Sequence, residues 1–185
     1  MATAGPIYPS PDGATYLAAL AALAVAAGPL TGYAVHQAAS DLLAPVLRPT
    51  ATSIGRFLEQ ASRDRGDHPT AGLVETSETS SSRAAQAFRI TSRGRGALHR
   101  SIVAPMSLAT AIYGHNAFDA KLLLAQRYAD GKHLRPLLDA QLAWLEENPV
   151  ALAFGTEEIL SAINQRRERE RSLIIEFINA LRKGG

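Results

Sequence analysis

The chain has 185 residues, a formal net charge of +2 and a pI near 9.1. This length allows one domain, or one domain with a small lobe, and a sizeable core. The chain contains no cysteine, which excludes disulfides, thiolate metal sites and a cysteine nucleophile. Ala and Leu dominate its apolar residues and aromatic residues make up only 6%, so helices packed through small side chains are favoured over a β-sandwich.

The chain begins with an extended arm and an unusually apolar helix. Prolines within residues 1–13 disfavour helix there, and Asp12 is a candidate cap for a helix over 14–27 that Gly28 and Pro29 end. This helix is apolar on nearly every face. We therefore expect it to be central in the protein or covered by another subunit.

Two more helices complete an N-terminal helical part that spans residues 14–65. Apolar side chains three or four positions apart predict these helices at about 32–47 and 53–65. Hydroxyl side chains supply the expected N-caps, which are Thr31 for the first helix and Thr52 or Ser53 for the second.

Residues 66–82 differ in composition from the helical part before them. They contain a proline, two glycines and a cluster of serine and threonine, which predicts a long linker. The linker also permits a short strand at 72–76.

Residues 83–185 predict a C-terminal helical part. Residues 83–90 are compatible with helix, the glycines in 91–96 interrupt it, and helical spacing resumes over 97–113. Three later helices are predicted at 117–129 (capped by Asn116), at 134–147, and at 157–183 (capped by Thr156). The whole pattern predicts an all-α fold, an irregular bundle of about six or seven helices with a long C-terminal helix.

The last helix changes character along its length. Residues 165–171 are polar on all sides, so this stretch must cross solvent or lie against a charged partner. The apolar residues in 173–181 must then dock on the main body or on a neighbouring copy.

The basic residues cluster in residues 83–100, inside a stretch from Glu78 to Asp119 that contains no other acid. All five basic side chains of this segment are arginines, whose planar guanidinium suits phosphate. Clustered arginine is the usual footprint of a polyanion site, although a subunit contact or an idle solvated surface would also account for it. The residues expected to contact nucleic acid are Arg83, Arg89, Arg93, Arg95, Arg100, Lys121, Arg166 and Arg167.

Motifs that carry chemistry are not found. The chain has no phosphate-binding glycine loop and no nucleophile elbow, and its five histidines are scattered. His115 and Asp119 have a spacing that could hold a metal, but no third ligand accompanies them. We expect no enzyme activity, no cofactor and no metal.

The apolar N-terminal region also prompts a test for a membrane segment. Its uncharged run breaks at Gly28 and Pro29 after about 14 residues, whereas a spanning helix needs about 20. Residues 1–12 lack the positive start of a signal peptide. We expect a cytoplasmic protein with no membrane partner, and keep a membrane-associated protein inserted through 14–47 as a weaker alternative.

In size, helical content and charge, the chain is similar to the small helical subunits of CRISPR ribonucleoprotein effectors. The similarity rests on these properties and on no motif. It implies a non-catalytic subunit that contacts a nucleic-acid backbone, with RNA or single-stranded DNA and other protein subunits or copies of itself as partners. The main alternative is a structural or assembly protein of a phage particle or secretion machine that does not bind nucleic acid.

Overall fold

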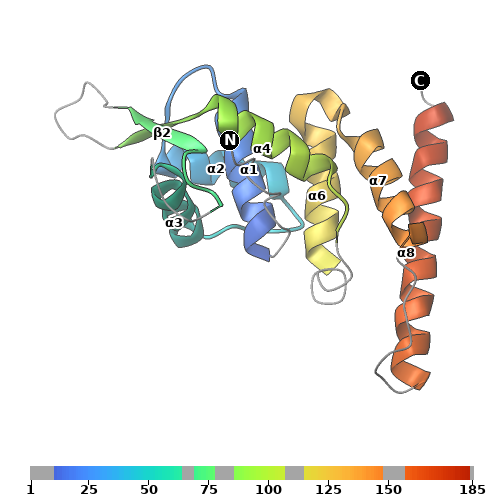
Figure 1. The fold of residues 1–185 in the computed structure, drawn as a ribbon. Helices are drawn as coiled ribbons and strands as arrows, with labels where there is room; N and C mark the ends of the chain where they lie inside the picture. The colour runs from blue at the N-terminus through green and yellow to red at the C-terminus, as the bar shows by residue number, and fades with distance from the viewer. Residues whose placement is uncertain (1–10, 64–68, 78–85, 107–114, 148–156, 184–185) are drawn as a thin grey trace.

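Figure 1 shows a computed structural model of the chain, which describes residues 11–63, 69–77, 86–106, 115–147 and 157–183. Within these ranges the protein is mostly helical, and the predicted all-α class with a long C-terminal helix is confirmed. The α-helices are α1 (Pro11–Val25), α2 (Gly32–Leu43), α3 (Ala51–Ala61), α4 (Ser92–Val103), α6 (His115–Arg127), α7 (Leu134–Glu147) and α8 (Glu157–Lys183). The 3₁₀ turn η1 (Tyr128–Gly131) joins α6 to α7, and the strands are β1 (Leu30–Thr31), β2 (Val74–Ser77) and β3 (Ala87–Ile90).

Helix α1 lies at the centre of the protein, as its apolar surface predicts (Figure 1). Its alanines Ala18, Ala19 and Ala21 are fully buried, and it packs against α2, α3, α4, α6 and β3. Small side chains let these neighbours approach closely and bury the apolar surface of α1. None of the helices in the described ranges combines the length and hydropathy needed to cross a membrane.

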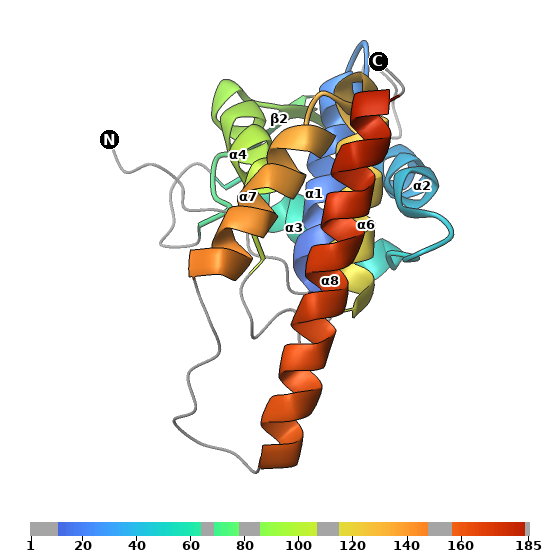
Figure 2. The same cartoon turned by 90° about the vertical axis from the view of Figure 1, so that its right-hand side faces the viewer.

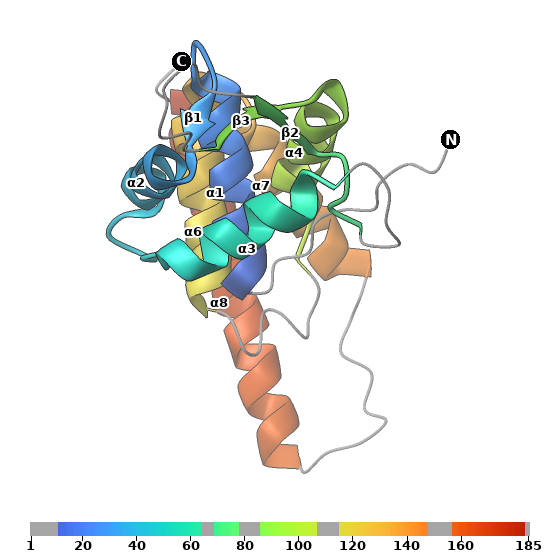
Figure 3. The same cartoon turned by 90° about the vertical axis from the view of Figure 1, so that its left-hand side faces the viewer.

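A small antiparallel sheet corrects one prediction. Strand β3 lies between β1 and β2, with Phe88 opposite Leu30 and Arg89 opposite Glu75 (Figure 3). The helix predicted over 83–90 is therefore wrong for 87–90. Pairing on both edges and burial of three of its four side chains outweigh the helical preference of this alanine-containing segment.

Helix α4 begins within 91–96, where the glycines predict an interruption. The Thr91 hydroxyl caps α4 by accepting the N–H of Gly94 at 3.0 Å, and it also lies 2.9 Å from the carbonyl oxygen of Gly72. A Cβ on Gly94 would overlap the carbonyl oxygen of Leu73. The interruption predicted over 91–96 is therefore wrong for 92–96, because Gly94 permits close packing of the helix rather than ending it.

The far end of α4 also differs from the predicted helix over 97–113. The helix ends at Val103, and the N–H of Ala104 bonds to the carbonyl of Arg100 at 3.0 Å. Pro105 follows and cannot continue the ladder. Residues 107–113 of the prediction lie outside the described part of the chain.

The helix starts show which predicted caps are correct. Thr31 caps α2 as predicted, since its hydroxyl accepts the N–H of Ala34 at 3.3 Å. Thr50, rather than Thr52 or Ser53, caps α3, because the helix starts earlier and the Thr50 hydroxyl accepts the N–H of Ser53 at 3.1 Å. The other predicted caps are Asp12 and Asn116, which lie inside α1 and α6, and Thr156, which lies outside the described residues.

Helices α7 and α8 form a second, smaller core beside the main one. Leu138 and Leu145 on α7 pack with Ile174 and Ile178 on α8, and the second pair is 1% and 7% exposed. The C-terminal part of α8 thus docks on the main body, one of the two outcomes its sequence predicts. Its N-terminal part projects beyond the other helices (Figure 2).

Candidate functional site

The outer face of α4 gathers several of the arginines that cluster in the sequence. The helix buries Ala97, Leu98 and Ile102 against the core. The exposed residues on its other side include the basic Arg93, Arg95, His99 and Arg100, together with Ser92. No acidic residue occurs in α4, so its exposed face is basic along its whole length.

Two of these arginines lie along one side of the helix. Arg93 and Arg100 are seven residues apart, which places them on one face. The Arg100 Nη1 lies 3.3 Å from where a Cβ on Gly96 would be, so the side chain folds back over that glycine toward Arg93. The Arg93 Nη1 lies 3.5 Å from the corresponding position at Gly72.

Arg95 has a structural contact that its sequence did not indicate. Its Nη1 donates to the carbonyl oxygen of Ala24 at 3.0 Å, near the C-terminal end of α1. A cation at a helix C-terminus satisfies a free carbonyl and is favoured by the helix dipole. The side chain remains exposed, so this contact leaves part of the guanidinium open to solvent.

Aromatic and histidine rings continue the basic face beyond Arg95. The His99 and His133 rings meet at 4.8 Å between centroids, and Tyr128 stacks on His133 at 5.5 Å. Burial lowers the pKa of His133, and the nearby His99 and Lys132 lower it further. Both of these neighbours are basic side chains, so an anion beside this ring would be favoured.

Arg89 lies apart from this helix face, on the exposed side of β3. Glu75 stands directly opposite it on β2, and both side chains are exposed. Opposite charges at such cross-strand positions stabilise the pair by about 0.2–1 kcal/mol. An acid directly across the strand pair makes Arg89 a weaker candidate for an anion than the arginines of α4.

Lys121 occupies the interior rather than the surface. Its side chain is 2% exposed, and its Nζ donates to the carbonyl oxygen of Ala104. Burial lowers the pKa of Lys121 to about 8. This lysine holds the chain that follows α4, and its ammonium does not belong to the exposed basic face.

Arg166 and Arg167 lie on α8, separated from α4 by α7 (Figures 1 and 2). Arg167 donates to the carbonyl oxygen of Leu145 at 2.8 Å and lies over the ring of Trp144. Arg166 lines a cavity between α6 and α8. The structure thus does not bring them next to the α4 arginines, and Arg83 lies outside the described residues.

Sequence reasoning missed the contribution of Lys132 and His133. These residues follow η1, where Ala129, Asp130 and Gly131 all have positive φ. That turn leads the chain back from α6 to α7, which packs against α4. His99 could be noted from the sequence because it lies in the stretch without acids. Lys132 and His133 could not, because only the geometry of this turn brings His133 against the His99 ring.

No metal site is found within the described residues, where no three His, Asp or Glu side chains come together to hold an ion. A comparison with protein-family models found no match, and a search of curated proteins found none either. The geometry of the α4 face is therefore the main guide to function.

Proposed function

We propose that the chain is a non-catalytic helical subunit of a larger assembly that contacts a nucleic-acid backbone through the exposed face of α4. The observation that carries this proposal is the acid-free face formed by Arg93, Arg95, His99 and Arg100. Lys132 and His133 extend it. A small subunit of a CRISPR-type ribonucleoprotein effector is one assembly in which such a face would serve.

The arrangement suits phosphate contacts better than base recognition. Guanidinium groups donate in pairs to phosphate oxygens, and such contacts position a nucleic acid without reading its sequence. The rings near Arg95 are packed on one another, and Tyr128 is only 6% exposed. We therefore expect little base stacking, and affinity that depends on salt more than on sequence.

Fluorescence anisotropy of labelled single-stranded RNA and DNA across a salt series tests the proposal. The informative variant is Arg93→Ala/Arg100→Ala, because these residues share one side of α4 and neither is the arginine that caps α1. A matched control, Arg56→Ala/Arg63→Ala, removes the same charge from exposed positions on or next to α3.

We expect binding that weakens steeply with salt, with a slope that falls by about 0.7 for each phosphate that the variant no longer neutralises. The α4 variant should bind at least about tenfold more weakly at low salt, while the control changes little. Flat anisotropy at low salt, or equal weakening in variant and control, would contradict the proposal. Flat anisotropy would favour the alternative, a structural or assembly protein without nucleic-acid binding, whereas equal weakening would show that any bound nucleic acid is attracted by general charge and not by the α4 face.

A further inference from the structure

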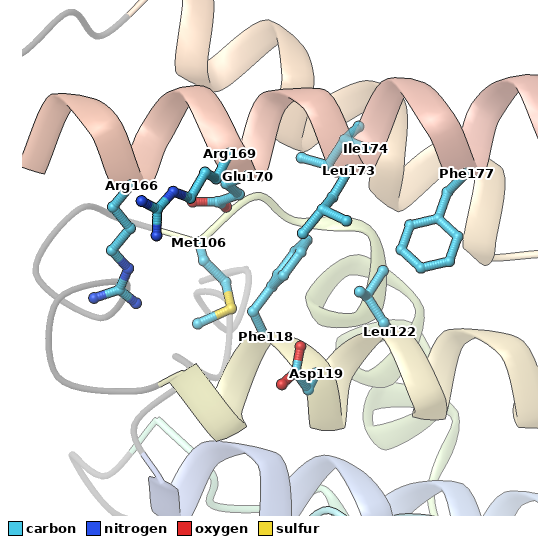
Figure 4. A pocket seen from close by; sticks show the side chains of 10 residues that line it. All are labelled: Met106, Phe118, Asp119, Leu122, Arg166, Arg169, Glu170, Leu173, Ile174 and Phe177. Atoms are coloured by element: carbon cyan, nitrogen blue, oxygen red, sulfur yellow. The ribbon is translucent and has the colours of Figure 1, made fainter.

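A cavity of about 290 Å³ lies between α6 and α8 (Figure 4). Its apolar walls come from both helices and include Phe118 and Leu122 on α6 and Leu173 and Phe177 on α8. Arg166 and Arg169 lie toward one end, away from Phe177 (Figure 4). The cavity is thus polarised, with cations at one end and apolar side chains at the other.

The apolar side chains of α8 in this cavity are incompletely covered by the protein. Leu173 and Phe177 are 54% and 49% exposed, although both are large and apolar. The helix docks on α7 through the neighbouring positions Ile174 and Ile178. Helix α8 therefore has a second apolar stripe, which the rest of the protein leaves partly exposed. A hollow lined by such side chains is typical of a ligand site.

The end of the cavity that contains the arginines also contains the carboxylate of Glu170, which already has a hydrogen-bond partner. Glu170 accepts a hydrogen bond from the Nε2 of the buried Gln141 at 3.1 Å. Burial raises the pKa of Glu170, while the Gln141 hydrogen bond and then Arg166 and Arg167 lower it. Arg166 thus acts partly on Glu170.

Arg169 is the second arginine of the cavity lining, besides Arg166. Its side chain is exposed, and it forms no ion pair with any residue in the described ranges. Asp119, the other acid of the lining, lies away from the two arginines and beside Phe118 (Figure 4). An anionic group is therefore favoured at the Arg169 end of the cavity.

We propose that this cavity binds a small amphipathic carboxylate. The head group would meet Arg169 and Arg166, and the apolar tail would lie between Phe118, Leu173 and Phe177. The cavity equals roughly ten times the volume that one water occupies in the liquid, which matches a ligand of about ten non-hydrogen atoms. A short chain or a single ring fits this volume, whereas a longer chain would extend into solvent past the half-exposed Leu173 and Phe177.

Isothermal titration with octanoate tests this proposal, at concentrations where the ligand remains monomeric. Octanol and octylamine have the same tail with a neutral and a cationic head group. We expect octanoate to bind saturably with one-to-one stoichiometry and octylamine to bind at least about tenfold more weakly, a difference of about 1.4 kcal/mol. Equal binding of all three, or octanoate binding without saturation, would overturn the proposal.

Variants with matched controls locate the binding site. Arg169→Gln should weaken octanoate about three- to tenfold and leave octanol unchanged, because one solvent-exposed cation is removed. Phe177→Ser should weaken both ligands. The controls are Arg171→Gln and Leu181→Ser, which alter the same helix at positions outside the cavity lining and should leave both affinities unchanged.

Two outcomes with these variants would overturn the assignment. The first is the same octanoate affinity in Arg169→Gln and Arg171→Gln. The second is a dimer of the free protein, detected by sedimentation, that Phe177→Ser alone converts to monomer without octanoate binding to either form. That result would assign this face to a second copy of the chain.

Discussion

The buried side-chain amide of Gln141 joins three parts of the chain. Its Nε2 donates to Glu170 on α8 at 3.1 Å, and its Oε1 accepts the backbone N–H of Met106 at 2.6 Å. Gln141 is itself fully buried on α7. One side chain therefore links α7 both to α8 and to the segment that follows α4.

Replacing Gln141 by leucine should be strongly destabilising. The Met106 N–H would stay buried without its acceptor, and Glu170 would lose its donor. We expect Gln141→Leu to lower the free energy of unfolding in urea by about 2–4 kcal/mol. Gln126→Leu, at an exposed position of α6, is the control and should change it by less than about 0.5 kcal/mol. Equal effects of the two substitutions would show that the network contributes nothing.

Two glycines should respond in opposite directions to alanine. A Cβ on Gly94 meets the Leu73 carbonyl oxygen, so Gly94→Ala must push α4 off the segment before β2 and lower the free energy of unfolding by about 2–3 kcal/mol. A Cβ on Gly55 meets no heavy atom within 4 Å. Gly55→Ala should therefore raise it by about 0.5–1 kcal/mol. Thermal melts of both variants check the pair, and a Gly94 variant as stable as wild type would refute the close packing.

The pKa of Lys121 predicts a rise in stability with pH. Burial lowers this pKa to about 8 from its ordinary value of 10.5, so between these values the unfolded state binds a proton that the folded state does not. The free energy of unfolding should consequently increase from pH 8 to pH 9.5, by about 1–2 kcal/mol from this group. Below pH 8 Lys121 is protonated in both the folded and the unfolded state, so the folded state bears the full cost of burying its charge.

Urea titrations at several pH values measure this contribution by difference. Lys121→Met should abolish the rise, whereas Lys132→Met, which removes an exposed lysine, should retain it. Parallel pH curves for wild type and Lys121→Met would contradict the lowered pKa.

His133 predicts that nucleic-acid binding is coupled to proton uptake. Its pKa is lowered by burial, by His99 and by Lys132, so a phosphate arriving here would favour the protonated ring and raise that pKa. Affinity should then increase as the pH falls from 7.5 to 5.5, by about three- to tenfold. The titratable groups that act on or contact this ring are His99 from α4, Tyr128 from η1 and the preceding Lys132.

Anisotropy titrations at each pH, at constant ionic strength, measure this coupling. His133→Gln should flatten the dependence. An identical pH dependence in the variant would exclude His133 as the group that takes up the proton.

The sequence identified most helices correctly because their apolar spacing is local information. The helix at 134–147 agrees with α7, and the apolar α1 is central as expected. The errors fall where distant contacts decide. Strand β3 exists because β1 and β2 pair with it, and the glycines of 91–96 start a helix because Gly94 packs on Leu73. In both cases the contacting residues lie outside the stretch of sequence over which helical spacing is judged, so the local pattern does not reveal them.

The basic site likewise combines features that the sequence reveals with features that only the packing of the helices determines. Its acid-free arginines could be read from composition, because charge patterning requires no fold. The interior position of Lys121 and the separation of Arg166 from α4 could not, because they depend on how α6, α7 and α8 pack. The cavity between α6 and α8 was also invisible, since its lining comes from residues about fifty positions apart.

The central position of α1 has a consequence for how the protein is made. This helix leaves the ribosome before its neighbours α4 and α6, which begin only at Ser92 and His115. The nascent chain can cover α1 with α2 and α3 early, but the sides of this alanine-rich helix that face α4 and α6 stay uncovered until those helices have been synthesised. Contacts of such long sequence separation slow folding, because a large loop must close before they form. During that interval the unfinished core is a natural substrate for chaperones.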